Sequence, residues 1–301
     1  MSNMSLTGKK RDYDTQRQLL GIIFIIPSVI FLLVFVVYPV CYNIILSFTD
    51  ARLMKSDFSF IAFDNYKKLF QNIRFLKYVK NTLIWTVFSV VGQLALGLAI
   101  ALLINKRANV TGLRSFLLVP YVVPAVALAL VTKWVTNGDY GIVSWWLNWI
   151  GLLEYRQSPL AVPGSAMAVL IIVNIWRSYP FPMLIYWATL KGISHEIYDA
   201  ASVDGCSAFQ MFWHITLPHL KSTTTVLAIL RIVWTATYFD LIWLITGGGP
   251  AGSTTHLPIM IYQTSFGTFQ TGYASSISVI LGLSLFVCIV FYVRKTISND
   301  R

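Results

Sequence analysis

Charged residues are scarce in this chain of 301 residues. Asp, Glu, Lys and Arg make up 12% of it and hydrophobic residues make up 56%, whereas soluble domains are nearer a quarter charged. Five long stretches carry no charge at all: residues 18–49, 81–105, 115–132, 157–176 and 241–293. This composition excludes an ordinary soluble protein and indicates that lipid is the main solvent. Because an isolated strand would leave backbone groups unpaired in lipid, we expect an all-α polytopic membrane protein.

Several kinds of chemical site are missing as well. No phosphate-binding G-x-x-x-x-G-K-[ST] run occurs, and the glycine-rich run 247–250 lacks the Lys. His195-Glu196 begins like a zinc motif, but position 199 is Asp rather than His. The cysteines show neither a pairing pattern nor metal-ligand spacing: Cys41, Cys206 and Cys288. We therefore expect no metal, no cofactor and no ATPase site in the chain, so that energy comes from a partner or from an ion gradient.

The apolar runs predict six membrane spans. About 20 apolar residues cross the roughly 30 Å hydrocarbon layer as a helix. The predicted spans cover residues 20–48, 81–104, 114–136, 162–190, 222–245 and 274–293, within a membrane domain at 19–294 and between tails at 1–18 and 295–301. Pro27 and Pro39 predict bends or ends in the first span, and Pro180 and Pro182 predict a break in the fourth.

The net charge of +11 is explained by basic loops that fix the membrane topology, rather than by nucleic-acid binding. With six spans, both termini share one side. Twelve basic residues fall on that side, in the tails and in the connections after spans two and four. The positive-inside tendency therefore places both termini and the 191–220 block in the cytoplasm. The connection 50–80 disagrees, because it carries seven basic residues on the expected outer side: Arg52, Lys55, Lys67, Lys68, Arg74, Lys77 and Lys80.

A polar block interrupts the apolar second half of the chain and begins with a short predicted helix. Ser194 is a plausible N-cap, and Glu196 and Asp199 follow in the opening turns, where acids suit the positive end of a helix. The small residues 200–202 would let another body approach the backbone closely. Gly205 can take the left-handed conformation that ends a helix.

A second short helix is predicted to follow. Ser207 and Gln210 fit a capping box that opens it, and Pro218 is expected to end it before span five begins. Its apolar face would hold Phe209, Phe212 and Trp213. This pair of helices is either a docking surface for a cytoplasmic partner or an amphipathic segment that lies on lipid. The acids and small residues favour docking, because helices that lie on lipid prefer Lys and Arg on their polar face.

The same block resembles the "EAA" loop of permease subunits in binding-protein-dependent ABC importers. That pattern is EAA, three residues, Gly, nine residues, Ile, one residue, Leu-Pro, and six of its seven fixed positions match. The matching segment, in which Asp199 stands where the family usually has Glu, comprises Asp199, Ala200, Ala201, Gly205, Ile215, Leu217 and Pro218. The resemblance implies that this loop, together with Glu196, contacts the ATPase subunits.

The resemblance extends along nearly the whole chain. The runs YPVCYNIILSFTD (38–50), FDNYKKLF (63–70), NTL (81–83), 114–141 and 246–266 look like carbohydrate-type permeases. It implies the transmembrane domain of a type I ABC importer for a sugar or related solute. The implied partners are a second, homologous permease, two ATP-binding subunits and an extracytoplasmic solute-binding protein. The alternative is an ion-coupled secondary transporter or channel, which would need coupling acids within the spans and internal repeats. Asp240 alone qualifies as such an acid, and no repeat is visible.

Charges inside the predicted spans are costly and usually functional. Arg231, Thr235 and Tyr238 advance by four and three residues along span five, so they should share one helix face. Arg231 lies about 15 Å into the span, near the midplane. This face is either the substrate path or a structural contact, in which Arg231 pairs with the second permease or with a broken helix. Asp240 lies off that face and more plausibly fixes the outer end. Arg177 sits beside the prolines of span four, and three tryptophans at 145, 146 and 149 predict a short helix at the outer interface.

Overall fold

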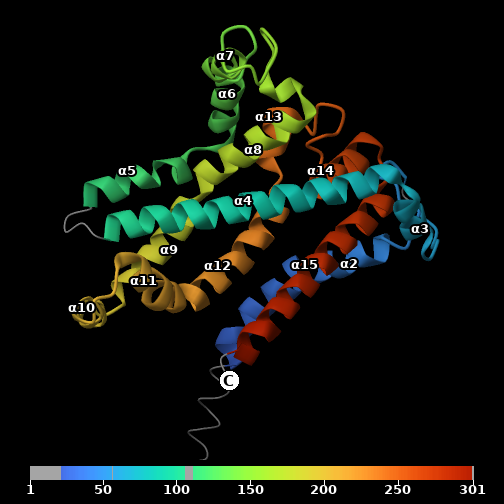
Figure 1. The fold of residues 1–301 in the computed structure, drawn as a ribbon. Helices are drawn as coiled ribbons and strands as arrows, with labels where there is room; N and C mark the ends of the chain where they lie inside the picture. The colour runs from blue at the N-terminus through green and yellow to red at the C-terminus, as the bar shows by residue number, and fades with distance from the viewer. Residues whose placement is uncertain (1–21, 56, 106–110, 300–301) are drawn as a thin grey trace, which may run out of the picture.

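The computed structural model describes residues 22–55, 57–105 and 111–299, and it is helical (Figure 1). Among these residues, the only β-structure is an isolated antiparallel bridge between Thr49 and Phe60. Three helices are long and apolar enough to cross a membrane, and there are up to six spans when each bent pair of helices counts as one. The all-α expectation is therefore confirmed. The predicted N-terminal tail, Lys106 and Arg107 lie outside the described residues.

The first span is a single helix, Ile22–Leu46, that lies against α15 (Thr271–Asn299). It contains a π-helical turn, η1 (Leu33–Val37), followed by α2 (Tyr38–Leu46). Neither Pro27 nor Pro39 ends the helix, which continues through both positions. At Pro39 the π-turn explains this, because the N–H of Tyr38 bonds to the carbonyl of Leu33 and the widened turn makes room for the ring.

The second span is longer than predicted. After α3 (Asp64–Gln71), helix α4 (Ile73–Asn105) runs for 33 residues, about 50 Å, through the centre of the bundle (Figure 1). The predicted start at 81 is too late, because the helix continues into a charged, amphipathic extension. Arg74, Lys77 and Lys80 are exposed there while Phe75 is buried. A charge-free stretch is bounded by the nearest charged residue, whereas a helix can continue through charged residues.

Three spans are broken. Helices α5 (Thr111–Val122) and α6 (Ala125–Val135) meet at 87°, and α8 (Pro163–Ser178) and α9 (Pro180–Lys191) meet at 43°. The helix Ala208–Ala236 and α13 (Asp240–Thr246) meet at 42°. The break at Pro180 is confirmed, whereas spans three and five were wrongly expected to be continuous. Pro124 explains the break in span three, because it has no N–H and disfavours the helical conformation of the residue before it.

Short elements complete the described chain. The predicted helix around the three tryptophans is confirmed as α7 (Ile142–Trp149), with all three side chains exposed. It is followed by η2 (Pro159–Ala161), and α13 leads through a loop to α14 (Leu257–Tyr262) and η4 (Gln263–Gly267). Helix α4 contacts α8, α9, α12 and α14, so that it forms the axis about which the other spans pack.

Candidate functional site

The polar block folds locally as its sequence predicts. Helix α10 (His195–Val203) begins at Ser194, whose hydroxyl oxygen accepts a hydrogen bond from the N–H of Glu196 at 3.3 Å. Gly205 has φ +82°, and the N–H of Cys206 donates to the carbonyl of Ala201 at 2.9 Å, which closes the helix end. Ser207 and Gln210 form the expected capping box at the start of α11 (Ala208–Met211). The starts of both helices and the end of α10 were therefore predictable from capping residues and Gly205.

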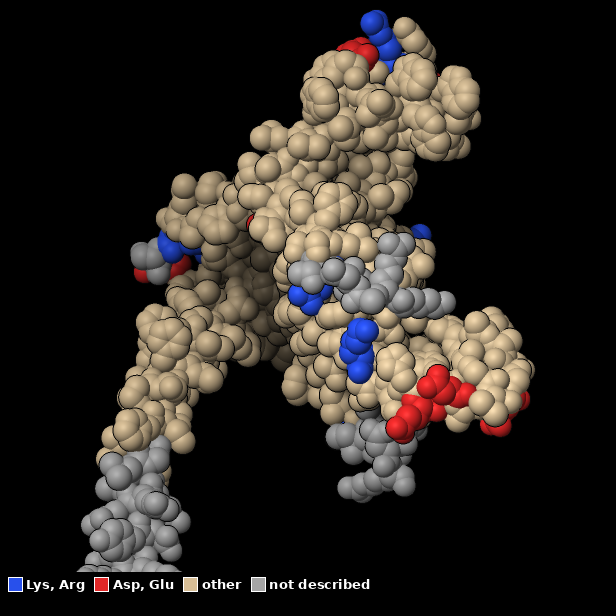
Figure 2. All heavy atoms as spheres, turned by 90° about the vertical axis from the view of Figure 1, so that its left-hand side faces the viewer, with Lys and Arg blue, Asp and Glu red and all other residues tan. Residues whose placement is uncertain are grey.

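Helix α10 projects from the bundle with most of its surface exposed. Its inner side is anchored by Ile193, which is buried, and by Tyr198, whose hydroxyl lies 2.9 Å from that of Thr216. The small residue Ala200 is exposed, and Ala201 is half-buried. The acids of the block lie on the exposed surface and form the acidic patch at the lower right of Figure 2: Glu196, Asp199 and Asp204.

Pro218 does not end the second helix, and this prediction is wrong. Helix α11 passes through a π-turn, η3 (Phe212–Thr216), into α12 (Leu217–Ala236), which makes one continuous helix from 208 to 236. The N–H of Leu217 bonds to the carbonyl of Phe212, five residues back. The widened turn accommodates the proline ring, which would clash with a carbonyl in a regular α-helix. The polar block is thus rigidly joined to span five.

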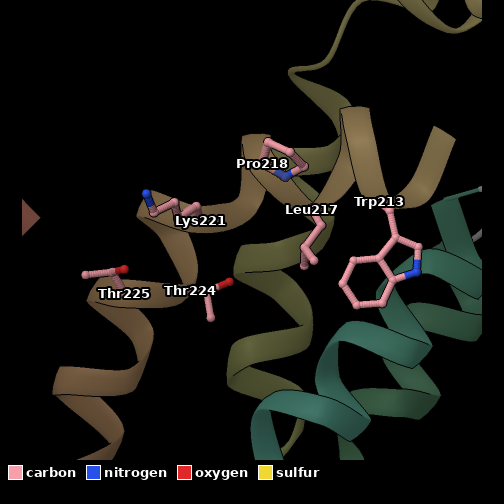
Figure 3. A pocket seen from close by; sticks show the side chains of 6 residues that line it. All are labelled: Trp213, Leu217, Pro218, Lys221, Thr224 and Thr225. Atoms are coloured by element: carbon pink, nitrogen blue, oxygen red, sulfur yellow. The ribbon is translucent and has the colours of Figure 1, made fainter. Parts of the chain in front are cut away.

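A groove of about 420 Å³ lies at this junction. Figure 3 shows the side chains of Trp213 and Leu217 on the side that faces the neighbouring helices, with Lys221 farther along α12. Its lining is taken from one continuous helix: Trp213, Leu217, Pro218, Lys221, Thr224 and Thr225. The groove lies on the helix 208–236, and the turn 204–207 joins this helix to α10.

A polar cavity of about 340 Å³ lies farther along the same helix, among α5, α8 and α12. Arg231 is 6% exposed, and its Nε donates to Gln93 Oε1 on α4 at 2.7 Å. Arg177 Nη1 donates to the hydroxyl of Tyr238. The lining combines charge, amides, hydroxyls and aromatic surface: Tyr121, Asn174, Arg177, Ser178, Arg231, Trp234, Thr235 and Tyr238.

Three of the four predicted pathway residues line this cavity, but they do not share one helix face as the helical periodicity predicted. Helix α12 ends at Ala236, so Tyr238 lies in the break before α13 rather than on the same helix face as Arg231 and Thr235. Asp240 does not line the cavity and is exposed in the first turn of α13.

Five lining residues were absent from the predicted pathway. Arg177 was singled out as an intramembrane charge, and Asn174 lies three residues before it and four before Ser178 on the same helix, which was a usable signal. Tyr121 and Trp234 had no such signal, because isolated aromatic residues are common in membrane helices.

The break at 237–239 leaves backbone carbonyls that other side chains satisfy. Trp85 Nε1 donates to the carbonyl of Thr235 at 2.8 Å, and His256 Nε2 lies 3.0 Å from the carbonyl of Tyr238. The hydroxyl of Thr237 donates to the carbonyl of Val233 at 2.8 Å. A broken helix is tolerated in a membrane only when its freed backbone groups are paired in this way.

A family comparison decides the class of protein. Residues 93–299 match the model of the binding-protein-dependent transport system inner membrane component. The chain belongs to this family. It is therefore a multi-pass membrane permease subunit of an ABC importer, and the family resemblance inferred from the 199–218 motif is confirmed. The alternative of an ion-coupled secondary transporter or channel finds no support among the relatives.

Relatives match over nearly their whole length. The chain is 33% identical to the sulfoquinovosyl glycerol transport system permease protein of Agrobacterium fabrum, covering 95% of this chain and 93% of that protein. It is 31% identical to a multiple sugar-binding transport system permease protein of Streptococcus mutans, covering 91% and 94%. It is 32% identical to a trehalose/maltose transport system permease protein of Thermococcus litoralis, covering 86% and 88%.

Solved structures share the fold. The chain superposes on a bacterial ABC transporter involved in alginate import with a TM-score of 0.83 and 24% identity, covering 97% of this chain and all of the other. A second structure, of a bacterial alginate ABC transporter in complex with an alginate pentasaccharide-bound periplasmic protein, gives a TM-score of 0.80 at 25% identity, covering 93% of this chain and 94% of that chain. Together with the family match, these likenesses support a solute-binding protein and ABC subunits as partners.

Proposed function

We propose that this subunit forms half of the translocation path for a sugar or a related solute, and that the cavity around Arg231 is part of that path. One observation carries the proposal. Polar side chains from three helices and a helix break converge on a single cavity within an otherwise apolar bundle. Exposing Arg231, Thr235 and Tyr238 to lipid would be costly, so their burial against a cavity has a functional purpose.

The chemistry of the cavity suits a sugar. Hydroxyl-rich solutes need hydrogen-bonding groups and aromatic surface, and the cavity offers both through Asn174, Thr235, Trp234 and Tyr238. Its volume of about 340 Å³ is at the lower end of the roughly 300–1,000 Å³ of small-molecule sites. The names of the three permease relatives, which include trehalose/maltose and sulfoquinovosyl glycerol systems, support the same class of solute.

In this proposal the subunit works with three kinds of partner. A second, homologous permease supplies the other half of the path. Two ATP-binding subunits drive transport, and one of them docks on α10, which is exposed and bears small residues and acids. A solute-binding protein delivers the solute from outside. Both termini and α10 lie in the cytoplasm, as the loop charges favour.

The coupling step uses the continuous helix 208–236. Pro218 and Arg231 are 13 residues apart on α12, a rise of about 20 Å. A displacement of α10 by the ATPase is passed through the four-residue turn 204–207 to α11, and from there through the π-turn and α12 to the cavity. This direct connection supports a mechanical link between ATP binding and the solute path.

The test is solute uptake by the complete importer in proteoliposomes, with ATP inside and its own binding protein outside. In the Tyr238→Ala and Arg231→Gln importers we expect apparent affinity or selectivity for the solute to change at least tenfold, while assembly and basal ATP hydrolysis persist. The matched control is Tyr155→Ala, which removes an aromatic ring that is 86% exposed and lies outside the cavity. Normal affinity and selectivity in both cavity variants would show that the cavity is not the path.

A further inference from the structure

Two arginines line the cavity, and no carboxylate lines it with them. Helices α4, α5, α8, α9 and α12 contain no Asp or Glu. Asp240 follows the helix break but is exposed and outside the lining. In the part of the chain that the structure describes, the one salt bridge joins Arg156 to Asp139, which is far from the cavity in sequence and on the surface. No carboxylate among the described residues therefore forms a salt bridge with either cavity arginine.

Neutral groups hold the two guanidinium groups in place. Arg231 bonds to Gln93 and lies over the ring of Trp234 at 5.7 Å, and Arg177 lies over the ring of Tyr238 at 5.3 Å. These contacts orient the positive charges but do not neutralise them. A charge in a membrane span without a counter-charge is costly, so its retention points to a charged partner that binds there.

Hydrogen-bond donors at the cavity also lack acceptors. The Nε of Arg177 and the Nδ2 of Asn174 are buried and have no partner among the described residues. Ser178 donates to Asn174 Oδ1 at 3.3 Å, which turns the amide so that its acceptor is used and its donor is free. A site with spare donors and positive charge fits a ligand rich in acceptors. Anionic oxygens form the shortest and strongest bonds to guanidinium groups.

We propose that the solute carries an anionic group (a carboxylate, sulfonate or phosphate ester on a sugar) and that Arg177 and Arg231 bind this group in the cavity. The proposal rests on the proposed function, because it names the charge of the solute for the same path. The competing explanation is a carboxylate of the second permease that pairs with the arginines in the assembled importer. The first explanation predicts a positively charged cavity, and the second predicts a cavity whose positive charge is reduced or neutralised in the assembled importer.

The charge of the cavity can be measured without knowing the solute. Tyr121 is 45% exposed and lines the cavity. In the complete importer with the three native cysteines replaced, a Tyr121→Cys variant is labelled with methanethiosulfonate reagents bearing either a sulfonate or a quaternary ammonium group. The labelling rate of each reagent is measured in the nucleotide-free and ATP-trapped states of the importer. Each labelling rate is then divided by the rate at which the same reagent reacts with free 2-mercaptoethanol. We expect the sulfonate reagent to be favoured by about tenfold or more.

Charge-changing variants identify the source of this preference. Arg177→Gln and Arg231→Gln should each lower the ratio severalfold, whereas Arg231→Lys should retain most of it because the charge is kept. As a ligand probe, a disaccharide of galacturonic acid should slow the labelling of Cys at position 121 at least tenfold more effectively than its carboxyl-reduced, neutral counterpart.

Failure of this inference is distinct from failure of the proposed function. Equal reagent rates, together with altered uptake in the Tyr238→Ala importer, would overturn the anionic solute and leave the path intact. The same holds if the acidic and the reduced disaccharide protect equally. Normal uptake in both Tyr238→Ala and Arg231→Gln would instead overturn the path itself, whatever the reagent rates.

Discussion

His256 is a fully buried histidine that ties the outer loop to the break in span five. It lies in the connection between α13 and α14, outside the spans, with 0% of its surface exposed. Its ring packs edge-on against Trp85 at 6.3 Å, and Nε2 lies 3.0 Å from the carbonyl of Tyr238. Since a carbonyl only accepts, the neutral ring carries its hydrogen on Nε2. This one side chain thus satisfies a carbonyl beside the cavity that the broken helix leaves free.

Burial makes this contact sensitive to acid. Desolvation lowers the pKa of His256 to about 4, against the hydrogen bond to Tyr238, which raises it. Because the folded pKa lies below the unfolded value of about 6.5, the unfolded chain binds more protons between these values. Stability is therefore complete above about pH 6.5 and falls as the pH drops toward 4.

We expect the purified importer to lose about 2 kcal/mol of unfolding free energy through this residue between pH 7.5 and pH 5. His256→Gln keeps a donor for the carbonyl but does not titrate, so its thermal unfolding should depend less steeply on pH. The matched control is His195→Gln, an exposed histidine, which should keep the slope of the unmodified importer. Parallel slopes for all three proteins would rule out His256 as the acid-sensitive group.

Long-range polar contacts of this kind could not be predicted from the sequence. In the sequence, Trp85 is an aromatic residue in an apolar run. Thr235 is a hydroxyl on a predicted helix face, and His256 is a histidine in a predicted loop. Their hydrogen bonds join positions 85 and 235 and positions 238 and 256. Only the packed bundle shows that they close one helix break. Local capping at Ser194 and Ser207 was predictable, because its partners lie within three residues.

Some features of the helices could likewise be predicted from the sequence and others could not. Apolar runs predicted six spans, and the structure has up to six candidate spans, because lipid excludes unpaired charge from long apolar segments. The ends and breaks were less predictable. Proline predicted the break at Pro180, but the helices do not end at Pro39 or Pro218, where π-turns accommodate the ring. Whether a proline breaks a helix depends on whether the preceding turn is an α-turn or a π-turn. No sequence pattern predicted which of the two forms.

The turn between α10 and α11 offers a test of coupling. Gly205 has φ +82°, and an added Cβ would meet no atom within 4 Å. Substitution there is opposed by backbone conformation rather than by lack of space, at about 1–2 kcal/mol for a residue other than glycine. A strained turn should tilt α10 away from its docking position on the ATPase.

We expect Gly205→Val importers to reach the membrane and assemble, but to lose most of the ATP hydrolysis that is stimulated by the loaded binding protein. Gly205→Asn is the matched control, because Asn tolerates the left-handed conformation, and it should retain most of the stimulation. The measurement is ATPase activity of the complete importer with and without its binding protein. Full stimulation in Gly205→Val would show that coupling does not depend on this turn.

The distribution of charge along the subunit leaves one conflict with the positive-inside tendency. The seven basic residues of 50–80 lie on the segment that contains α3 and on the extension of α4, at the end of α4 that also holds α14 (Figure 1). The α10 block lies toward the other end (Figure 1). One of these charges has a structural use, because Lys77 Nζ donates to the carbonyl of Ala251 in the α13–α14 loop at 2.9 Å.

This arrangement places the basic segment and α10 at opposite ends of α4 (Figure 1), and we expect the basic segment outside because the charges of the other loops favour a cytoplasmic α10. The sides are separated by α4, so the 50–80 segment and α10 cannot share a compartment if α4 crosses the membrane. Single-cysteine variants Ser59→Cys and Ser207→Cys, both exposed positions, should report opposite sides in intact cells after the native cysteines are removed. A membrane-impermeant maleimide should label position 59 from outside and position 207 only after the cells are opened. Labelling of position 207 in intact cells would reverse the orientation and remove α10 from reach of a cytoplasmic ATPase. Labelling of both positions from one side would instead show that α4 does not span the membrane.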